Sequence, residues 1–175
     1  TGADVSLQVS TAGLEASGTG NMKFMLNGAV TCGTMDGANI EIVEFAGKQN
    51  NYIFGAEVDE IERLKREGYS PAALLNTPLC ARAVEALVNG EFSDGGTGGF
   101  KELYESLING ASWHAPDNYF VLYDLKSYYE ALLSINADYK QKFAFAEKQL
   151  INEASAAYFS SDRTIREYVA AIWKI

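Results

Sequence analysis

Cysteine and histidine are scarce in this sequence, and their scarcity removes whole classes of site. The 175 residues include two cysteines, Cys32 and Cys80, which match no zinc-ligand spacing and give no disulfide framework. We therefore expect no metal and a reducing, cytoplasmic compartment. Cys32 stands in an apolar run, where a buried thiol acts as a small hydrophobic side chain. His114 is the only histidine, and its context, Trp113-His-Ala-Pro116, is more typical of a structural residue than of a catalytic one.

Positive charge is also in short supply. Lysine and arginine total 14 against 23 aspartates and glutamates, which gives a formal net charge of -9. A sequence-independent nucleic-acid binder takes most of its affinity from Lys and Arg on phosphates, so this class is disfavoured. The sequence has no cationic amphipathic helix for a membrane surface and no apolar stretch long enough to span a bilayer. We expect partners that are neither nucleic acids nor membranes.

The first third of the chain has the pattern of an α/β fold. Short apolar runs at residues 5–9, 29–32 and 52–54 are bounded by Gly, Thr or Asn, as buried strands usually are. The segments between them are long enough for crossover connections, so parallel strands are predicted. The chain opens on Thr1 rather than on methionine, and its first residues have the pattern of the start of a strand. We expect a piece of a longer protein.

From about residue 58 onward the hydrophobic period becomes helical. Apolar residues recur on one helix face within 100–108, 125–132 and 165–172, and the last of these follows a capping cluster at 160–162. Pro71 and Pro78 each follow a Ser or Thr and suit the first turns of two further helices. Residues 91–99 contain four glycines and are predicted to form a flexible surface loop.

Residues 39–45 fit a strand and a helix about equally. Their apolar positions are 40, 42, 43 and 45, which match neither period strictly. Asp36 could cap a helix that begins at Gly37, and we therefore predict a helix here.

The most informative segment is rich in glycine and runs from Thr11 to Gly28. It follows a predicted strand and leads into a predicted helix at residues 21–26. This order offers backbone N–H groups and the positive end of a helix dipole to an anion. Gly18 and Gly20 would allow close approach, and the Ser and Thr at 17 and 19 add hydroxyl donors. The segment is therefore predicted to bind a phosphate group.

Two common phosphate motifs do not fit. A P-loop requires a lysine directly after its second glycine, and Thr19 stands in that place. The dinucleotide fingerprint starting at Gly18 and Gly20 would need its third glycine where Lys23 stands. Lys23 instead suggests an amine that bonds a phosphate-bearing aldehyde such as pyridoxal phosphate, because its apolar neighbours would keep it from water. A lysine that snorkels from a helix surface explains the pattern equally well.

A longer stretch decides between these alternatives. Ser10-Thr-Ala-Gly-Leu-Glu-Ala-Ser-Gly-Thr-Gly-Asn-Met-Lys-Phe-Met-Leu-Asn-Gly28, continued by Gly33-Thr-Met-Asp-Gly-Ala-Asn-Ile-Glu-Ile42, resembles the pyridoxal-phosphate segment of the glycogen, starch and maltodextrin phosphorylases. The resemblance continues through residues 52–55, 159–165 and 172–173, with a less characteristic middle at about 65–150. It implies residues 1–175 are the C-terminal part of the second of two Rossmann-like domains in a GT-B glycosyltransferase.

The resemblance also implies a role for each matching residue. Lys23 would carry the cofactor as an imine, and Thr19 and Gly20, with Gly18, would bind its 5′-phosphate. The side chain of Glu15 would hydrogen-bond a sugar hydroxyl. The backbone after it would contact the same glucosyl unit, at Ala16, Ser17 and Gly18.

The activity implied is reversible phosphorolysis of α-1,4-glucan to glucose 1-phosphate, with inorganic phosphate as co-substrate, in a homodimeric cytoplasmic enzyme. The cofactor's phosphate would exchange a proton with the substrate phosphate. The basic residues that hold inorganic phosphate would lie upstream, so we expect this piece alone to be inactive. The alternative is a cofactor-binding or interaction module without turnover. A hydrolase built on Glu15, Asp36, Glu41 and Glu44 is disfavoured, because Asp36 and Glu41 suit a cap and a solvated helix face.

Overall fold

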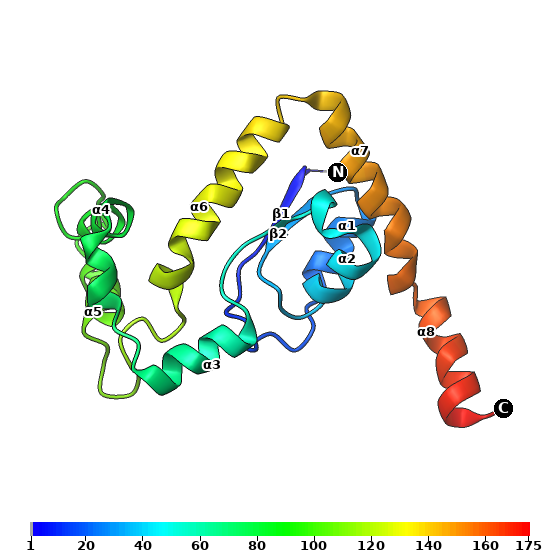
Figure 1. Ribbon diagram of the computed structural model, residues 1–175, viewed down its shortest axis with the longest axis horizontal. Coiled ribbons are helices and arrows are strands. Elements are labelled where there is room, and N and C mark those ends of the chain that lie inside the picture. The colour runs from blue at the N-terminus through cyan, green and yellow to red at the C-terminus, as the bar shows by residue number, and fades with distance from the viewer. Residues whose placement is uncertain (1) are drawn as a thin grey trace. The chain divides into compact units, whose positions relative to one another are not determined.

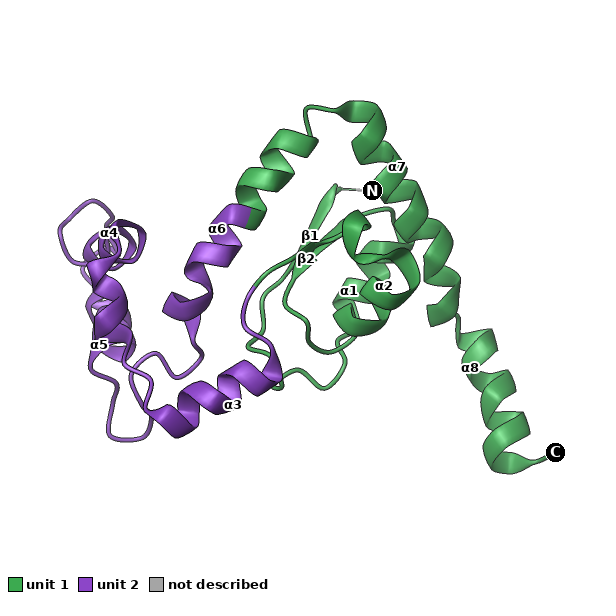
Figure 2. Cartoon of the chain, viewed as in Figure 1, with its two compact units in different colours: residues 1–54, 131–175 green, residues 55–130 purple. Residues whose placement is uncertain are grey.

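The computed structural model describes residues 2–175 (Figure 1), which form two compact units (Figure 2). Unit 1 comprises residues 1–54 and 131–175, and unit 2 comprises residues 55–130. The unit boundary falls within the longest helix, α6 (Val121–Asp138). No helix in the described part of the chain is both long enough and apolar enough to cross a membrane.

Unit 1 contains a parallel sheet of three short strands. β1 (Val5–Gln8), β2 (Val30–Gly33) and β3 (Tyr52–Ile53) are hydrogen-bonded in the order β1-β2-β3. Val5 pairs with Val30, and Cys32 with Tyr52. Every residue of β2 is buried, including the polar Thr31. The prediction of an α/β fold with parallel strands is confirmed.

Helices return the chain between these strands. α1 (Gly20–Leu26) follows β1, and α2 (Asn39–Ala46) with the short η1 (Lys48–Asn50) follows β2. Met25 of α1 and Ile42 of α2 are fully buried in one cluster with Ala46 and Ala156. The last of these belongs to η3 (Ala156–Phe159), which continues α7 (Lys142–Ser155). The helix predicted at 39–45 is confirmed.

The chain ends in α8 (Ser161–Tyr168) and η4 (Val169–Trp173). Ser160 occupies the N-cap position as predicted, but its side chain makes no capping bond to the described residues. The predicted apolar face does not enter the core of this chain, because Ile165, Ile172 and Trp173 are each about half exposed or more. Periodicity identified the helix correctly but could not say what covers it.

Unit 2 is helical. It contains α3 (Val58–Glu67), η2 (Pro71–Asn76), α4 (Pro78–Glu85), α5 (Gly99–Ile108) and the first part of α6. Pro71 and Pro78 open their helices as predicted, although the first of these is a 3-10 helix. Residues 91–98 form a mostly exposed loop, and α5 already begins at Gly99. Within the loop, Asp94 accepts hydrogen bonds from the backbone N–H of Gly96 and of Phe100 in α5. These bonds lower the pKa of Asp94.

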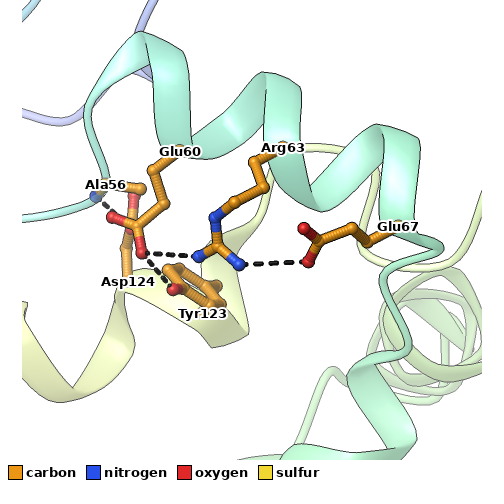
Figure 3. Close-up of polar contacts among 6 residues, drawn as sticks. All are labelled: Ala56, Glu60, Arg63, Glu67, Tyr123 and Asp124. Atoms are coloured by element: carbon orange, nitrogen blue, oxygen red, sulfur yellow. Dashed lines mark hydrogen bonds and ion pairs between the residues drawn. The ribbon is translucent and has the colours of Figure 1, made fainter.

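Buried aspartates connect the helices of unit 2. Asp124 of α6 accepts a hydrogen bond of 2.8 Å from the backbone N–H of Ala56, just before α3, and Tyr123 donates to Glu60 of α3 (Figure 3). Asp117 accepts bonds from the first N–H groups of α6 and from the Tyr69 hydroxyl. Burial raises the pKa of both aspartates, because a charged carboxylate is less well solvated inside the protein.

The raised pKa of Asp124 predicts how unit 2 responds to pH. A folded-state pKa above the unfolded value means that stability falls as pH rises from below the unfolded pKa through the folded one. Asp124→Asn keeps an acceptor for the Ala56 N–H and removes the charge. Between pH 4 and pH 7, the variant should therefore lose less protection from hydrogen exchange than the parent protein does. Asp124→Ala should cost about 1–3 kcal/mol at both pH values, because the Ala56 N–H loses its acceptor. Native-state hydrogen exchange of residues 55–60 measures each effect. Equal pH dependence in the parent and Asp124→Asn proteins would contradict the assignment.

Candidate functional site

The candidate site lies where two parallel strands end. Residues 9–19 connect β1 to α1, and residues 34–38 connect β2 to α2. Because the strands are parallel and adjacent, both connections leave the same edge of the sheet. This carboxyl edge is where open α/β sheets bind their ligands. The glycine-rich segment and the segment around Asp36 therefore meet.

Asp36 holds the glycine-rich segment in place. Its Oδ1 accepts a hydrogen bond from the backbone N–H of Gly13 at 3.0 Å, and its Oδ2 accepts one from the N–H of Glu15 at 2.9 Å. The Ser10 hydroxyl donates to Oδ2 at 3.0 Å. The prediction that Asp36 caps α2 is wrong: α2 begins after Ala38, and no side chain caps it within the described residues. A carboxylate engaged by three donors is also ill suited to be the acid of a hydrolase.

A second contact fixes the segment from the other side of Ala16. The backbone N–H of Ala38 donates to the carbonyl oxygen of Ser17. Gly37 has a φ of +49° there, and a Cβ added to it would collide with the same oxygen. Only glycine fits this approach. Residues 36–38 thus hold both Glu15 and Ser17.

A buried chain of amides joins the starts of α1 and α2. The Asn21 side chain donates to Asn39 at 3.0 Å, and Asn39 donates to the carbonyl oxygen of Thr34 at 3.0 Å. Asn21 also accepts a hydrogen bond from the N–H of Met22 in the first turn of α1. Sequence reasoning missed these residues. The one available signal was the recurrence of asparagine in the first turn of two helices that each follow a strand.

The side chains of the segment stay exposed although its backbone is held. Glu15, Ser17 and Thr19 are exposed, as is Ala16. Gly18 has a φ of +85°, which favours glycine, and a Cβ there would lie 3.2 Å from the Asn21 side-chain oxygen. A fixed backbone with free polar side chains is the arrangement expected of a surface that receives a ligand.

Lys23 lines a cavity of about 350 Å³ beside α1. Gly20, Phe24 and Asn27 line it as well, together with Gly2 and Ala3. Apolar neighbours in the sequence were expected to keep the amine from water, and this is wrong within the chain: only Met25 turns into the core, and Lys23 is exposed. The amine is available to a ligand, but these residues alone do not desolvate it.

Gly20 is the most telling residue of this cavity. A Cβ added to it would meet no atom of the described residues within 4 Å. Its φ is also not in the left-handed region, so neither the backbone nor the packing of the described residues 2–175 requires glycine. Open space at the first residue of α1, three residues before Lys23, leaves room for a ligand group to approach the backbone.

Two other residues, His114 and Cys32, have surroundings that suit the structural roles expected for them. The His114 ring contacts the carbonyl oxygen of Ala115 at 2.8 Å and the Ser106 hydroxyl at 3.4 Å, and its backbone forms an isolated bridge with Ala111. Burial raises the pKa of Cys32 to about 11, so its thiol stays protonated near neutral pH.

Comparison with known proteins matches this chain along its whole length. A family model described as carbohydrate phosphorylase covers residues 1–175. The chain is 46% identical over 174 residues to a glycogen phosphorylase of Bacillus subtilis (strain 168), covering 98% of this chain and 21% of that protein. It is 45% identical over 174 residues to a glycogen phosphorylase of Synechocystis sp., covering 99% and 20%. It is 44% identical over 172 residues to the brain form of glycogen phosphorylase from Ovis aries, covering 98% of this chain and 20% of that protein.

The chain therefore spans about one fifth of the length of these relatives. The match to the family model is continuous over residues 1–175, and it uses the sequence and not the geometry around Asp36 and Lys23. By that match, the chain belongs to the carbohydrate phosphorylase family.

Proposed function

We propose that the protein containing this chain is an α-1,4-glucan phosphorylase. It transfers a terminal glucosyl unit from glucan to inorganic phosphate and releases glucose 1-phosphate. Membership of the carbohydrate phosphorylase family supports this, as do the names of the glycogen phosphorylases that it resembles. The full protein is a cytoplasmic homodimer in this proposal. Turnover belongs to that protein, because the chain spans about one fifth of its relatives.

The chain would form the C-terminal part of the second Rossmann-like domain of a GT-B enzyme. Three parallel strands with helical connections suit such a domain. β1 pairs with β2 alone among the described strands, and its other edge can accept a further strand. Leu7, within β1, and Val9, just after it, are 49% and 62% exposed. Apolar exposure beside an open edge is consistent with a sheet that continues in the longer protein.

The cofactor in this proposal is pyridoxal 5′-phosphate, held covalently by Lys23. The observation that carries the assignment is the open space at Gly20 on the cavity that Lys23 lines. Its volume of about 350 Å³ lies at the low end of the range for small-ligand pockets, roughly 300–1,000 Å³. The residues present therefore fit the group: Thr19, Gly20 and Gly18 would receive its phosphate, and Lys23 its aldehyde carbon.

The remaining residues would hold the sugar. Pyridoxal phosphate would supply a phosphate that exchanges a proton with the substrate phosphate. Glu15 accepts a hydrogen bond from a sugar hydroxyl, and the backbone of Ala16, Ser17 and Gly18 contacts the same unit. Asp36 and residues 37–38 fix these groups before substrate arrives, so they need not reorganise during the reaction.

The chain alone would have no turnover, because it spans about one fifth of its relatives and its candidate groups Glu15, Ser17 and Lys23 are exposed. A second candidate is therefore a cofactor- or partner-binding module. Exposure of Glu15, Ser17 and Lys23 on a held backbone favours binding by the isolated piece. Release of glucose 1-phosphate by residues 1–175 alone would overturn this assignment of inactivity.

Covalent attachment can be tested by mass spectrometry. The full-length protein is incubated with pyridoxal phosphate and reduced with borohydride, and its peptides are mapped. We expect the adduct on Lys23, because that amine is exposed beside the open face of Gly20. Lys23→Arg should abolish the adduct and phosphorolysis, whereas Lys126→Arg, on an exposed lysine of α6, should change neither. An adduct on another lysine would refute the assignment.

Gly20→Ala separates ligand approach from folding. Alanine is the better helix former, and its Cβ would meet no atom in the part of the chain that the structure describes, so thermal stability should be unchanged or slightly higher. Cofactor affinity should fall about tenfold or more, since one lost charge-assisted hydrogen bond is worth roughly 1.5–3 kcal/mol. Gly99→Ala is the matched control, because Gly99 is also the first residue of a helix with room for a Cβ. Equal cofactor titrations for both variants would show that the phosphate lies elsewhere.

A further inference from the structure

We propose that Asp36 is the positioning residue for the sugar-binding segment, and that it sets the affinity for glucan through Glu15. This inference rests on the proposed function. Asp36 is 5% exposed and would not touch the substrate itself. It acts through hydrogen bonds to residues 21 to 26 positions earlier in the sequence, which join the connection after β1 to the connection after β2.

The bond to Glu15 carries the argument. The Glu15 N–H lies 2.9 Å from Asp36 Oδ2, while its own carboxylate is exposed. The N–H is one bond from the Cα that carries the side chain, so fixing it restricts where the Glu15 carboxylate can reach. Two residues on, the Ser17 carbonyl oxygen is fixed by Ala38. The segment from Glu15 to Ser17 is held at both ends by residues 36–38.

A carboxylate is the group that this position requires. Its three partners, the N–H groups of Gly13 and Glu15 and the Ser10 hydroxyl, all donate. An ionised carboxylate only accepts, so it can satisfy all three at once. An asparagine would turn its NH₂ group toward at least one donor. Asp36→Asn therefore changes the shape of the buried side chain little and breaks at least one of the three bonds.

Steady-state kinetics of the full-length enzyme distinguish positioning from a structural role. Glu15 hydrogen-bonds the sugar in both the ground state and the transition state. Displacing Glu15 therefore weakens binding of both states equally and raises KM. For Asp36→Asn we expect KM for glucan to rise about tenfold or more and kcat to change less than about threefold. A loss of folded enzyme would lower the apparent kcat and leave KM unchanged, and that result would overturn the proposal.

Asp124→Asn is the matched control. Asp124 is also buried and also accepts from a backbone N–H, but it belongs to unit 2. The KM of the Asp124→Asn variant for glucan should equal that of the parent protein. If Asp36→Asn does not fold, Ser10→Ala removes one neutral donor from Asp36 and should raise KM by roughly two- to tenfold. An unchanged KM in Ser10→Ala would then count against the proposal.

Hydrogen exchange keeps this inference separable from the proposed function. In the parent protein, the Gly13 and Glu15 amides should exchange slowly, and in Asp36→Asn at least one should exchange about tenfold faster or more. If the parent protein has no phosphorolysis, the proposed function fails, and exchange still decides whether Asp36 holds the segment. Unchanged protection at both amides in Asp36→Asn would overturn the anchoring.

Discussion

Parallel pairing of three short strands is the constraint on which unit 1 depends. A parallel strand cannot be reached by a tight turn, so each connection crosses back over the sheet, and here α1 and α2 provide the crossings. The same pairing brings the ends of β1 and β2 to one edge. Without it, Asp36 would not reach the glycine-rich segment that its carboxylate holds.

The polar groups at this edge divide by burial into two kinds. Asn21, Asn39 and Asp36 are buried and satisfied by hydrogen bonds within the chain. Glu15 and Lys23 are exposed and remain accessible to a ligand. Buried polar networks of this kind specify one arrangement of the backbone, since any other would leave an amide or carboxylate without a partner at a cost of roughly 1–3 kcal/mol each. The backbone that carries the exposed groups is thereby fixed in one arrangement.

Local pattern predicted much of the fold and part of the site. The strands, the glycine-rich segment and the helix that carries Lys23 each depend on neighbours within about ten positions, which is the range that periodicity and capping describe. The role of Asp36 could not be predicted in this way, because its partners Gly13 and Glu15 lie 23 and 21 positions away. An aspartate before a helix commonly caps it, and the tertiary pairing of two loops overrode that local preference.

The open edge of β1 has a consequence for handling the chain by itself. A strand edge presents unpaired backbone donors and acceptors, and the apolar side chains of Leu7 and Val9, in β1 and just after it, are exposed. Another copy of the chain can supply a strand as readily as the rest of the polypeptide can. Expressed alone, the piece should therefore be prone to self-association through β1. Lysine or proline substitutions in β1 that block strand addition should raise its solubility.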